Sequence, residues 1–178
     1  MPPLRVGILG CAAISGKSRR GIVAAGHVVA AIASRDLHKA EAWAAEAVAC
    51  GDVPELPTAY GTYEALLADA SIDCVYVPLP CATHVRWVPL CARAGKGVLL
   101  EKPTATSAAE LEVMVQACKD AGVPLVDGTM FVHHERLTAM GAAVRDAATF
   151  GALGRVACAF SFRGDEVRRR RRRHEGLR

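Results

Sequence analysis

Val98-Leu99-Leu100-Glu101-Lys102-Pro103 joins a short apolar run to an acid, a base and a helix-starting proline. The apolar run indicates a buried strand, so Lys102 stands at its carboxyl end. Open α/β sheets bind their ligands at this end of their strands. A lysine suits such a site because desolvation lowers a lysine pKa toward neutrality and lets the group exchange a proton. The alternative is an ordinary strand-to-helix turn with a solvated lysine.

Strand-like apolar runs recur along the chain and alternate with alanine-rich stretches of helical period. The expected strands cover residues 4–9, 28–33, 58–60, 73–77, 98–101 and 124–126, and the expected helices cover residues 37–48, 62–68, 84–94 and 108–121. Strands and helices that alternate at this spacing form right-handed βαβ units. The sequence therefore predicts an α/β fold, a Rossmann-type doubly wound parallel sheet over residues 1–127.

Local signals support the ends of two expected helices. Thr106 or Ser107 followed by Glu110 predicts a capping-box start, and Gly95 and Gly122 predict helix ends.

The pattern changes after residue 127. We expect a helix at about residues 134–148 and then a strand at residues 155–162, with Val156, Cys158, Phe160 and Phe162 on one face. We interpret residues 128–164 as the first helix and strand of an incomplete α+β second domain. Residues 165–178 form a separate arginine-rich tail, and the abrupt change there predicts a C-terminally truncated chain.

Composition limits the class of protein. The chain is 52% hydrophobic and 22% charged, which is typical of a globular protein. We expect a cytoplasmic protein without a membrane partner, because no apolar run reaches the roughly 18 residues of a span and no signal peptide precedes the first strand.

The net charge of +4 arises in the tail, so the folded part has no basic bias toward nucleic acid. Seven cysteines without a C-x-x-C pair indicate buried thiols and no metal site.

Five motifs occur in a fixed order. Arg5-Val6-Gly7-Ile8-Leu9-Gly10-Cys11-Ala12 opens the chain, Ala33-Ser34-Arg35-Asp36 follows, and Tyr76-Val77-Pro78-Leu79-Pro80 with His84 precedes Glu101-Lys102-Pro103. Together they resemble the Gfo/Idh/MocA family of nicotinamide-dependent oxidoreductases, in the branch of dihydrodiol dehydrogenase and NADP-dependent D-xylose dehydrogenase with its plant members. The resemblance covers about residues 4–166 and implies hydride transfer to or from a sugar or trans-diol carbon.

The first turn is a degenerate dinucleotide fingerprint. Gly10, Ala12 and Ser15 stand at the three glycine positions of G-x-G-x-x-G, so only the first glycine is kept. Alanine still lets the backbone approach a pyrophosphate, whose charge the amides at a helix N-terminus would meet. The predicted contacts come from Gly10, Cys11, Ala12, Ala13 and Ile14. The alternative is a purely structural turn.

Ser34 and Arg35 favour NADP over NAD. They stand where an NAD enzyme often has an acid for the ribose hydroxyls, and a guanidinium with a hydroxyl can bind a 2′-phosphate. Lys39, one helical turn later, adds positive charge. The alternative is that Arg35 is a solvated loop residue and Asp36 the N-cap of the next helix.

The family resemblance assigns the remaining candidates. It implies that Pro78, Leu79 and Pro80 line the cofactor crevice with His84 nearby, although His84 can also be read as an ordinary first residue of a helix. It further implies that Glu101 contacts the nicotinamide ribose, that Lys102 lies beside the substrate oxygen as the catalytic residue, and that the Lys102–Pro103 bond is often cis. In relatives an aspartate with a histidine or tyrosine partners the lysine, and nothing between residues 162 and 178 replaces it.

Two other readings remain open. The chain can be a non-catalytic dinucleotide-binding module or a partner of full-length relatives, and a longer form can be a homo-oligomer. The arginine run can also be a nuclear-targeting or nucleic-acid tail, but it lacks interleaved aromatic residues and follows the end of the resemblance. A small-molecule substrate is therefore the expected partner, and nucleic acid is not.

Overall fold

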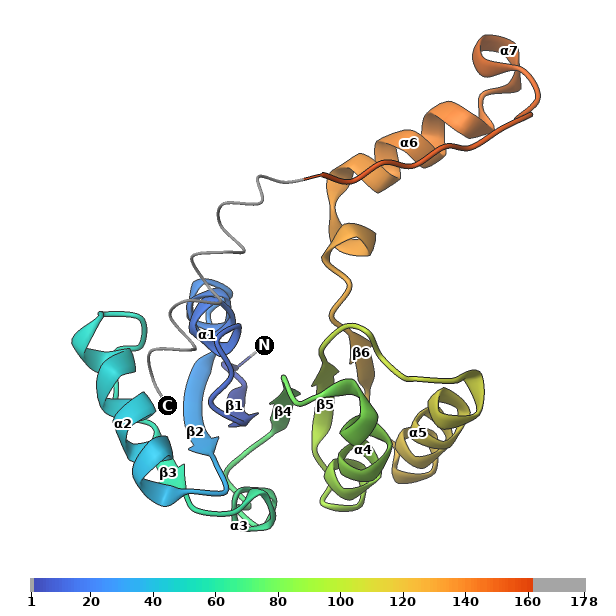
Figure 1. Cartoon of the computed structure of the whole chain (residues 1–178). Coiled ribbons are helices and arrows are strands. Elements are labelled where there is room, and N and C mark those ends of the chain that lie inside the picture. Colours follow the sequence, from blue (N-terminus) through green and yellow to red (C-terminus); the bar gives the residue numbers. More distant parts are fainter. Residues whose placement is uncertain (1, 162–178) are drawn as a thin grey trace. The chain divides into compact units, whose positions relative to one another are not determined.

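The computed structural model describes residues 2–161, whose central element is a six-stranded parallel sheet (Figure 1). The strand order is β3-β2-β1-β4-β5-β6. The strands are β1 (Arg5–Leu9), β2 (Val28–Ala33), β3 (Thr58–Tyr60), β4 (Cys74–Val77), β5 (Gly97–Leu100) and β6 (Leu125–Asp127). The order reverses between β1 and β4, as in a doubly wound sheet, and the predicted fold class is confirmed.

Helices cover both faces of the sheet. They are α1 (Ser15–Ala24), α2 (Leu37–Ala49), α3 (Tyr63–Leu67), α4 (His84–Arg93) and α5 (Ala108–Ala121), with a short 3-10 turn, η1 (Cys81–Thr83), before α4. Ile22 of α1 and Trp43 of α2 join one buried cluster, while Leu66 of α3, Val88 of α4 and Met114 of α5 join the other. Two hydrophobic cores therefore lie on opposite faces of the sheet.

One row of side chains shows where the helical cover ends. Neighbouring strands align Ile32, Ile8, Tyr76, Leu99 and Val126 across the sheet. Their exposed fractions are 0%, 0%, 2%, 36% and 42% in that order. Because the buried cluster under α1 and α2 takes its sheet residues from β3, β2, β1 and β4 and none from β5 or β6, Tyr76 is the last covered residue of this row.

Local capping agrees with the sequence signals. The Ser107 side chain accepts a hydrogen bond from the amide of Glu110, and the Glu110 carboxylate accepts one from the amide of Thr106. The hydrogen bonds from Thr106 hold the pKa of Glu110 below its usual value. Gly122 ends α5 with φ at +66°, a conformation that favours glycine.

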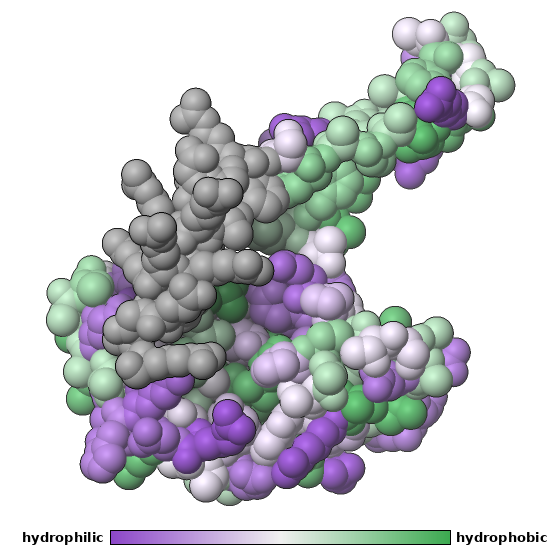
Figure 2. Space-filling view, in the orientation of Figure 1, coloured by the Kyte–Doolittle hydropathy of each residue, from purple (hydrophilic) through white to green (hydrophobic). Residues whose placement is uncertain are grey.

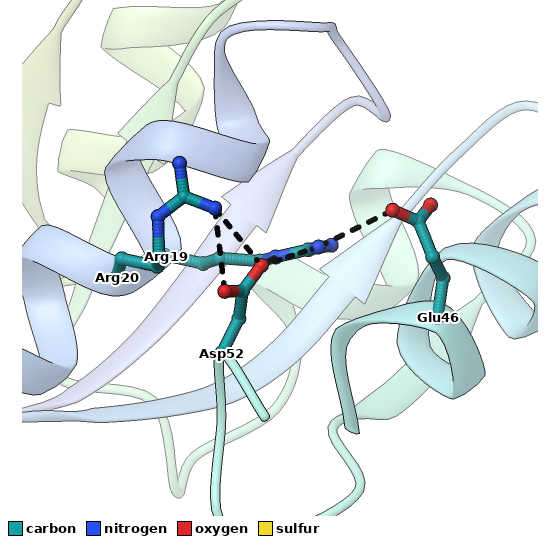
Figure 3. A network of polar contacts seen from close by, with 4 residues as sticks. All are labelled: Arg19, Arg20, Glu46 and Asp52. Atoms are coloured by element: carbon teal, nitrogen blue, oxygen red, sulfur yellow. Dashed lines mark hydrogen bonds and ion pairs between the residues drawn. The ribbon is translucent and has the colours of Figure 1, made fainter. Parts of the chain in front are cut away.

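A buried ion-pair network fastens α1 to the segment after α2 (Figure 3). The Arg19 side chain is 4% exposed and contacts both Glu46 and Asp52, and Arg20 approaches Asp52 from the same helix. The Arg19 guanidinium also lies 4.8 Å from the centre of the Trp43 ring. Sequence reasoning did not identify this network, because its members are up to 33 residues apart.

The described chain divides into two units after Met130. The 3-10 turn η2 (Met130–His133) begins at this division, and the second unit continues with α6 (Glu135–Arg145) and α7 (Ala147–Phe150). The single helix expected at residues 134–148 is wrong, because Asp146 leaves the helical conformation and its side chain caps α7. Neither helix buries a side chain, and Figure 2 shows largely apolar residues over them.

The strand expected at residues 155–162 is also wrong as far as the structure describes it. Residues 152–161 form neither helix nor strand. A strand needs a neighbour for its backbone hydrogen bonds, and no described segment offers one here. Phe162 and the arginine-rich tail at residues 165–178 lie outside the described residues.

Candidate functional site

Parallel strands bring the sequence motifs to one edge of the sheet. β2, β1, β4 and β5 are successive neighbours, and the candidate residues follow their carboxyl ends. The turn after β1, Ser34 after β2, the loop after β4 and Glu101 after β5 therefore share the edge where such sheets bind ligands.

The turn after β1 has the geometry of a phosphate-binding turn. Gly10 adopts φ +106°, and its amide donates to the carbonyl of Ala33 at 2.8 Å. The buried Ser15 hydroxyl donates to the Gly10 carbonyl at 3.1 Å and closes the turn. Within the described part of the chain, the amides of Ala12, Ala13 and Ile14 have no hydrogen-bond acceptor. They precede α1, at the positive end of its dipole.

The turn also lies close to the loop after β4. A Cβ built on Gly10 would come within 3.0 Å of a Leu79 methyl carbon. Cys11, the next residue, donates from its thiol to the carbonyl of Lys39 at 3.6 Å. Burial raises the pKa of the Cys11 thiol. This thiol is therefore a packing group rather than a reactive one.

The segment after β2 places two cations beside the turn. Ser34 is buried, whereas Arg35 and Lys39 are exposed and form no ion pair among residues 2–161. Asp36 is the N-cap of α2, as the alternative reading expected, and accepts hydrogen bonds from the amides of His38 and Lys39. Among the described residues the Asp36 carboxylate forms this cap and no ion pair with Arg35.

His84 connects the loops that follow β4 and β5. Its ring is 1% exposed, with Nδ1 3.0 Å from the carbonyl oxygen of Thr104 and Nε2 2.9 Å from that of Leu79. Pro78 is buried, Leu79 half-buried and Pro80 exposed. His84 is the first residue of α4, as the alternative reading expected. Its ring also joins two candidate loops, which that reading did not include.

Glu101 is held by two donors. The Tyr76 hydroxyl donates to Oε1 at 2.6 Å, and the Lys102 amide donates to Oε2 at 3.1 Å. The Ser18 hydroxyl, from the first turn of α1, lies 2.9 Å from the Tyr76 oxygen. Burial and the bond to Glu101 raise the pKa of Tyr76, so this phenol stays protonated and acts as a donor.

Sequence reasoning assigned no role to Tyr76 or Ser18. The available signal was a tyrosine near the carboxyl end of an otherwise aliphatic strand, Cys-Val-Tyr-Val, since a buried phenol needs a hydrogen-bond partner.

Lys102 follows Glu101, two residues after the end of β5, and its bond to Pro103 is cis, as the resemblance implied. Its side chain is exposed, so residues 2–161 do not supply the desolvation expected at a lysine-centred site. Beside it, the Thr104 hydroxyl hydrogen-bonds Asp127 at the end of β6, and Asp127 accepts from the Thr129 amide at 2.6 Å. The backbone around Lys102 is thus fixed from two neighbouring strands.

The described residues contain neither a candidate metal site nor a membrane-spanning helix. No group of three or more His, Cys, Asp or Glu side chains is placed to hold a metal ion. No helix there has the length and apolar character to cross a membrane.

Fold and site together define a dinucleotide-binding α/β domain. The chain belongs to the Gfo/Idh/MocA family, whose profile, described as an oxidoreductase family with an NAD-binding Rossmann fold, matches residues 4–129. The NADP-type D-xylose 1-dehydrogenase 2 of Haloferax volcanii is 44% identical over 167 residues, which cover 91% of this chain and 49% of the relative. The human trans-1,2-dihydrobenzene-1,2-diol dehydrogenase is 38% identical over 101 residues, which cover 57% of this chain and 28% of the relative.

A solved structure agrees. KijD10, a 3-ketoreductase from Actinomadura kijaniata crystallised with TDP-benzene and NADP, superposes with a TM-score of 0.69 at 31% identity, over 82% of this chain and 44% of that one. The chain thus spans about half the length or less of the relatives that it matches.

Proposed function

We propose that this chain binds NADP and belongs to an oxidoreductase that transfers a hydride to or from a carbon of a sugar or a trans-diol. The observation that carries the proposal is the turn at residues 10–14. Among residues 2–161, the three amides before α1 have no acceptor, and Arg35 and Lys39, in the segment after β2, form no ion pair. NADP-dependent relatives of the same family support the choice of cofactor.

The residues fit a dinucleotide. Gly10 has no side chain where the backbone must approach the pyrophosphate, and alanine at residues 12 and 13 keeps the turn open. In this assignment the pyrophosphate is bound by residues 11–14, and the 2′-phosphate is bound by Ser34, Arg35 and Lys39. The crevice for the cofactor is lined by Pro78, Leu79, Pro80 and the region of His84. The nicotinamide ribose is bound by Glu101. NAD, which lacks the 2′-phosphate, would leave Arg35 without its anion.

Bound NADP supplies the hydride acceptor or donor. The part of this chain in the chemistry is to orient the dinucleotide and to place Lys102 beside the reacting substrate oxygen, where its ammonium can give or take a proton. A sugar or diol presents such an oxygen, and two relatives act on D-xylose and trans-dihydrobenzenediol by name. The seven unpaired cysteines fit the predicted cytoplasmic setting.

A second candidate is a module that binds the dinucleotide without catalysis, alone or with longer relatives. The exposure of Lys102 favours it, because residues 2–161 neither desolvate this lysine nor give its ammonium a hydrogen-bond partner.

Titration of the 178-residue chain with NADPH and with NADH, followed by cofactor fluorescence, tests the proposal. We expect saturable binding with NADPH preferred. Absence of binding to both dinucleotides would refute both candidate functions, and equal affinities would refute the role of Arg35.

A further inference from the structure

Tyr76 occupies an unusual place in the sheet. It is the only hydroxyl-bearing member of the row formed with Ile32, Ile8, Leu99 and Val126, and it is 2% exposed. An aliphatic residue would fill such a position without the cost of burying a hydroxyl. The phenol is satisfied because its oxygen lies within hydrogen-bond distance of Glu101, which follows β5, and of Ser18 on α1.

The hydrogen bonds run in one direction. The Ser18 hydroxyl has two acceptors for its one hydrogen, the Tyr76 oxygen at 2.9 Å and the Ile14 carbonyl at 3.3 Å, and the Tyr76 oxygen is the nearer. The Tyr76 hydroxyl donates to Oε1 of Glu101. The second distance, 2.6 Å, is in the range of a charge-assisted bond to a carboxylate. Successive bonds of this kind strengthen one another. The result is a relay from the first turn of α1 to the end of β5.

The relay fixes the carboxylate of Glu101. Tyr76 donates to one oxygen and the Lys102 amide to the other, so the plane of the group is set while each oxygen keeps a lone pair for a further donor. A glutamate held in this way does not have to lose its rotamer freedom when it binds a ligand. Two lone pairs directed from one rigid carboxylate suit two neighbouring hydroxyls, as on a ribose.

We propose that Tyr76 is a positioning residue that orients Glu101 toward the nicotinamide ribose and, through Ser18, couples this orientation to α1, the helix that receives the pyrophosphate. The inference rests on the proposed function and deepens it. The ribose hydroxyls are common to NADPH and NADH, so the contribution of Tyr76 must be the same for both cofactors. The contribution of Arg35 must appear with NADPH alone.

The test compares Tyr76→Phe with Tyr60→Phe in the full chain. Tyr60 is a matched control on β3, because its hydroxyl also donates to a carboxylate, that of Asp69, at 2.9 Å. We expect Tyr76→Phe to weaken NADPH and NADH about 5- to 10-fold each, as the net contribution of one ordinary hydrogen bond implies. Tyr60→Phe should leave both affinities unchanged. Ser18→Ala, which keeps the phenol, should weaken both dinucleotides about 2- to 3-fold.

A double-mutant cycle separates positioning from packing. If Tyr76 acts through Glu101, Tyr76→Phe has no further effect on binding in a Glu101→Ala background. An equal loss in both backgrounds would overturn the inference. Unchanged dinucleotide binding by Tyr76→Phe would also overturn the inference about Tyr76. In that case, an NADPH preference that is lost on substitution of Arg35 would still support the proposed function. Absence of dinucleotide binding by the unsubstituted chain would overturn both.

Discussion

The guanidinium of Arg19 lies against the carboxylate of Asp52, with Nε and Nη2 2.7 and 2.6 Å from the same oxygen, Oδ2. Both side chains are less than 10% exposed, so this pair is shielded from water on the face of the sheet that α1 and α2 cover. The pair connects the helix after the first turn to the segment after α2. It holds α1 in place without touching the candidate site.

Removal of the Asp52 charge is therefore expected to destabilise the chain. Asp52→Asn leaves the buried Arg19 with only the exposed Glu46 as a counter-charge, and an unpaired buried charge is costly. We expect thermal melts to show a Tm lower by about 5 °C or more. Glu46→Gln is the control, because the Glu46 side chain is 63% exposed and an exposed carboxylate contributes little to such a pair.

The same pair sets a pH dependence. The hydrogen bond from Arg19 holds the pKa of Asp52 below its usual value, against the opposing effect of burial. A lowered folded-state pKa gives a stabilisation that is present above the ordinary aspartate pKa and lost as the pH falls through the lowered value. The Tm difference between wild type and Asp52→Asn should be constant above about pH 5 and shrink below about pH 4. A difference that grows in acid would contradict this account.

Gly10 is expected to tolerate no side chain. Its φ of +106° strains any other residue, and a Cβ would also approach Leu79. We expect Gly10→Ala to cost about 1–3 kcal/mol of unfolding free energy and to abolish dinucleotide binding. Gly21→Ala, in open space within α1, should instead be neutral or stabilising by up to about 1 kcal/mol. Urea unfolding and cofactor titration measure both effects.

His84 is expected to matter for the loops that it joins. His84→Leu keeps an apolar bulk but removes the ring nitrogens that lie 3.0 Å from the Thr104 carbonyl oxygen and 2.9 Å from that of Leu79, at a cost of about 1–3 kcal/mol. Dinucleotide affinity should fall as well, since Leu79 packs next to the Gly10 turn. His38→Leu, at a side chain that is 93% exposed, is the matched control. Equal melting temperatures for both variants would remove His84 from the site.

The sequence predicted what local pattern controls. Alternating strands and helices gave the sheet, and Ser107, Glu110 and Gly122 marked the limits of α5 because caps act within a few residues. Contacts between distant segments were missed: Ser18 and Tyr76 are 58 residues apart, and nothing local marks their hydrogen bond. The division of residues 134–148 into α6 and α7 was missed because an aspartate is compatible with a helix interior. Only the hydrogen bonds that the Asp146 side chain accepts at the start of α7 reveal the break.

Charge reversal at Arg35 is expected to change the cofactor preference. Arg35→Asp removes a cation from the predicted 2′-phosphate site and adds repulsion, so NADPH affinity should fall about 10- to 100-fold, the equivalent of about 1.5–3 kcal/mol. NADH affinity should stay the same or rise. Arg93→Asp, at the exposed end of α4, controls for the change in net charge. Loss of NADPH and NADH binding to the same extent would show that Arg35 does not contact the phosphate.

The 178-residue chain is expected to bind NADPH while showing little dehydrogenase turnover. Residues 2–161 provide the turn, Glu101 and Lys102, but they give the Lys102 ammonium no hydrogen-bonded acid–base partner and leave it exposed. The loss of a positioned general acid or base costs about 10²- to 10⁴-fold in rate, before lost substrate orientation is counted. An assay of NADP⁺ reduction with pentoses, hexoses and trans-diols, run beside the binding titration, measures this. Lys119→Ala, at an exposed lysine of α5, is the control for Lys102→Ala. Robust turnover that Lys102→Ala abolishes and Lys119→Ala leaves intact would show that the residues of this chain complete the site.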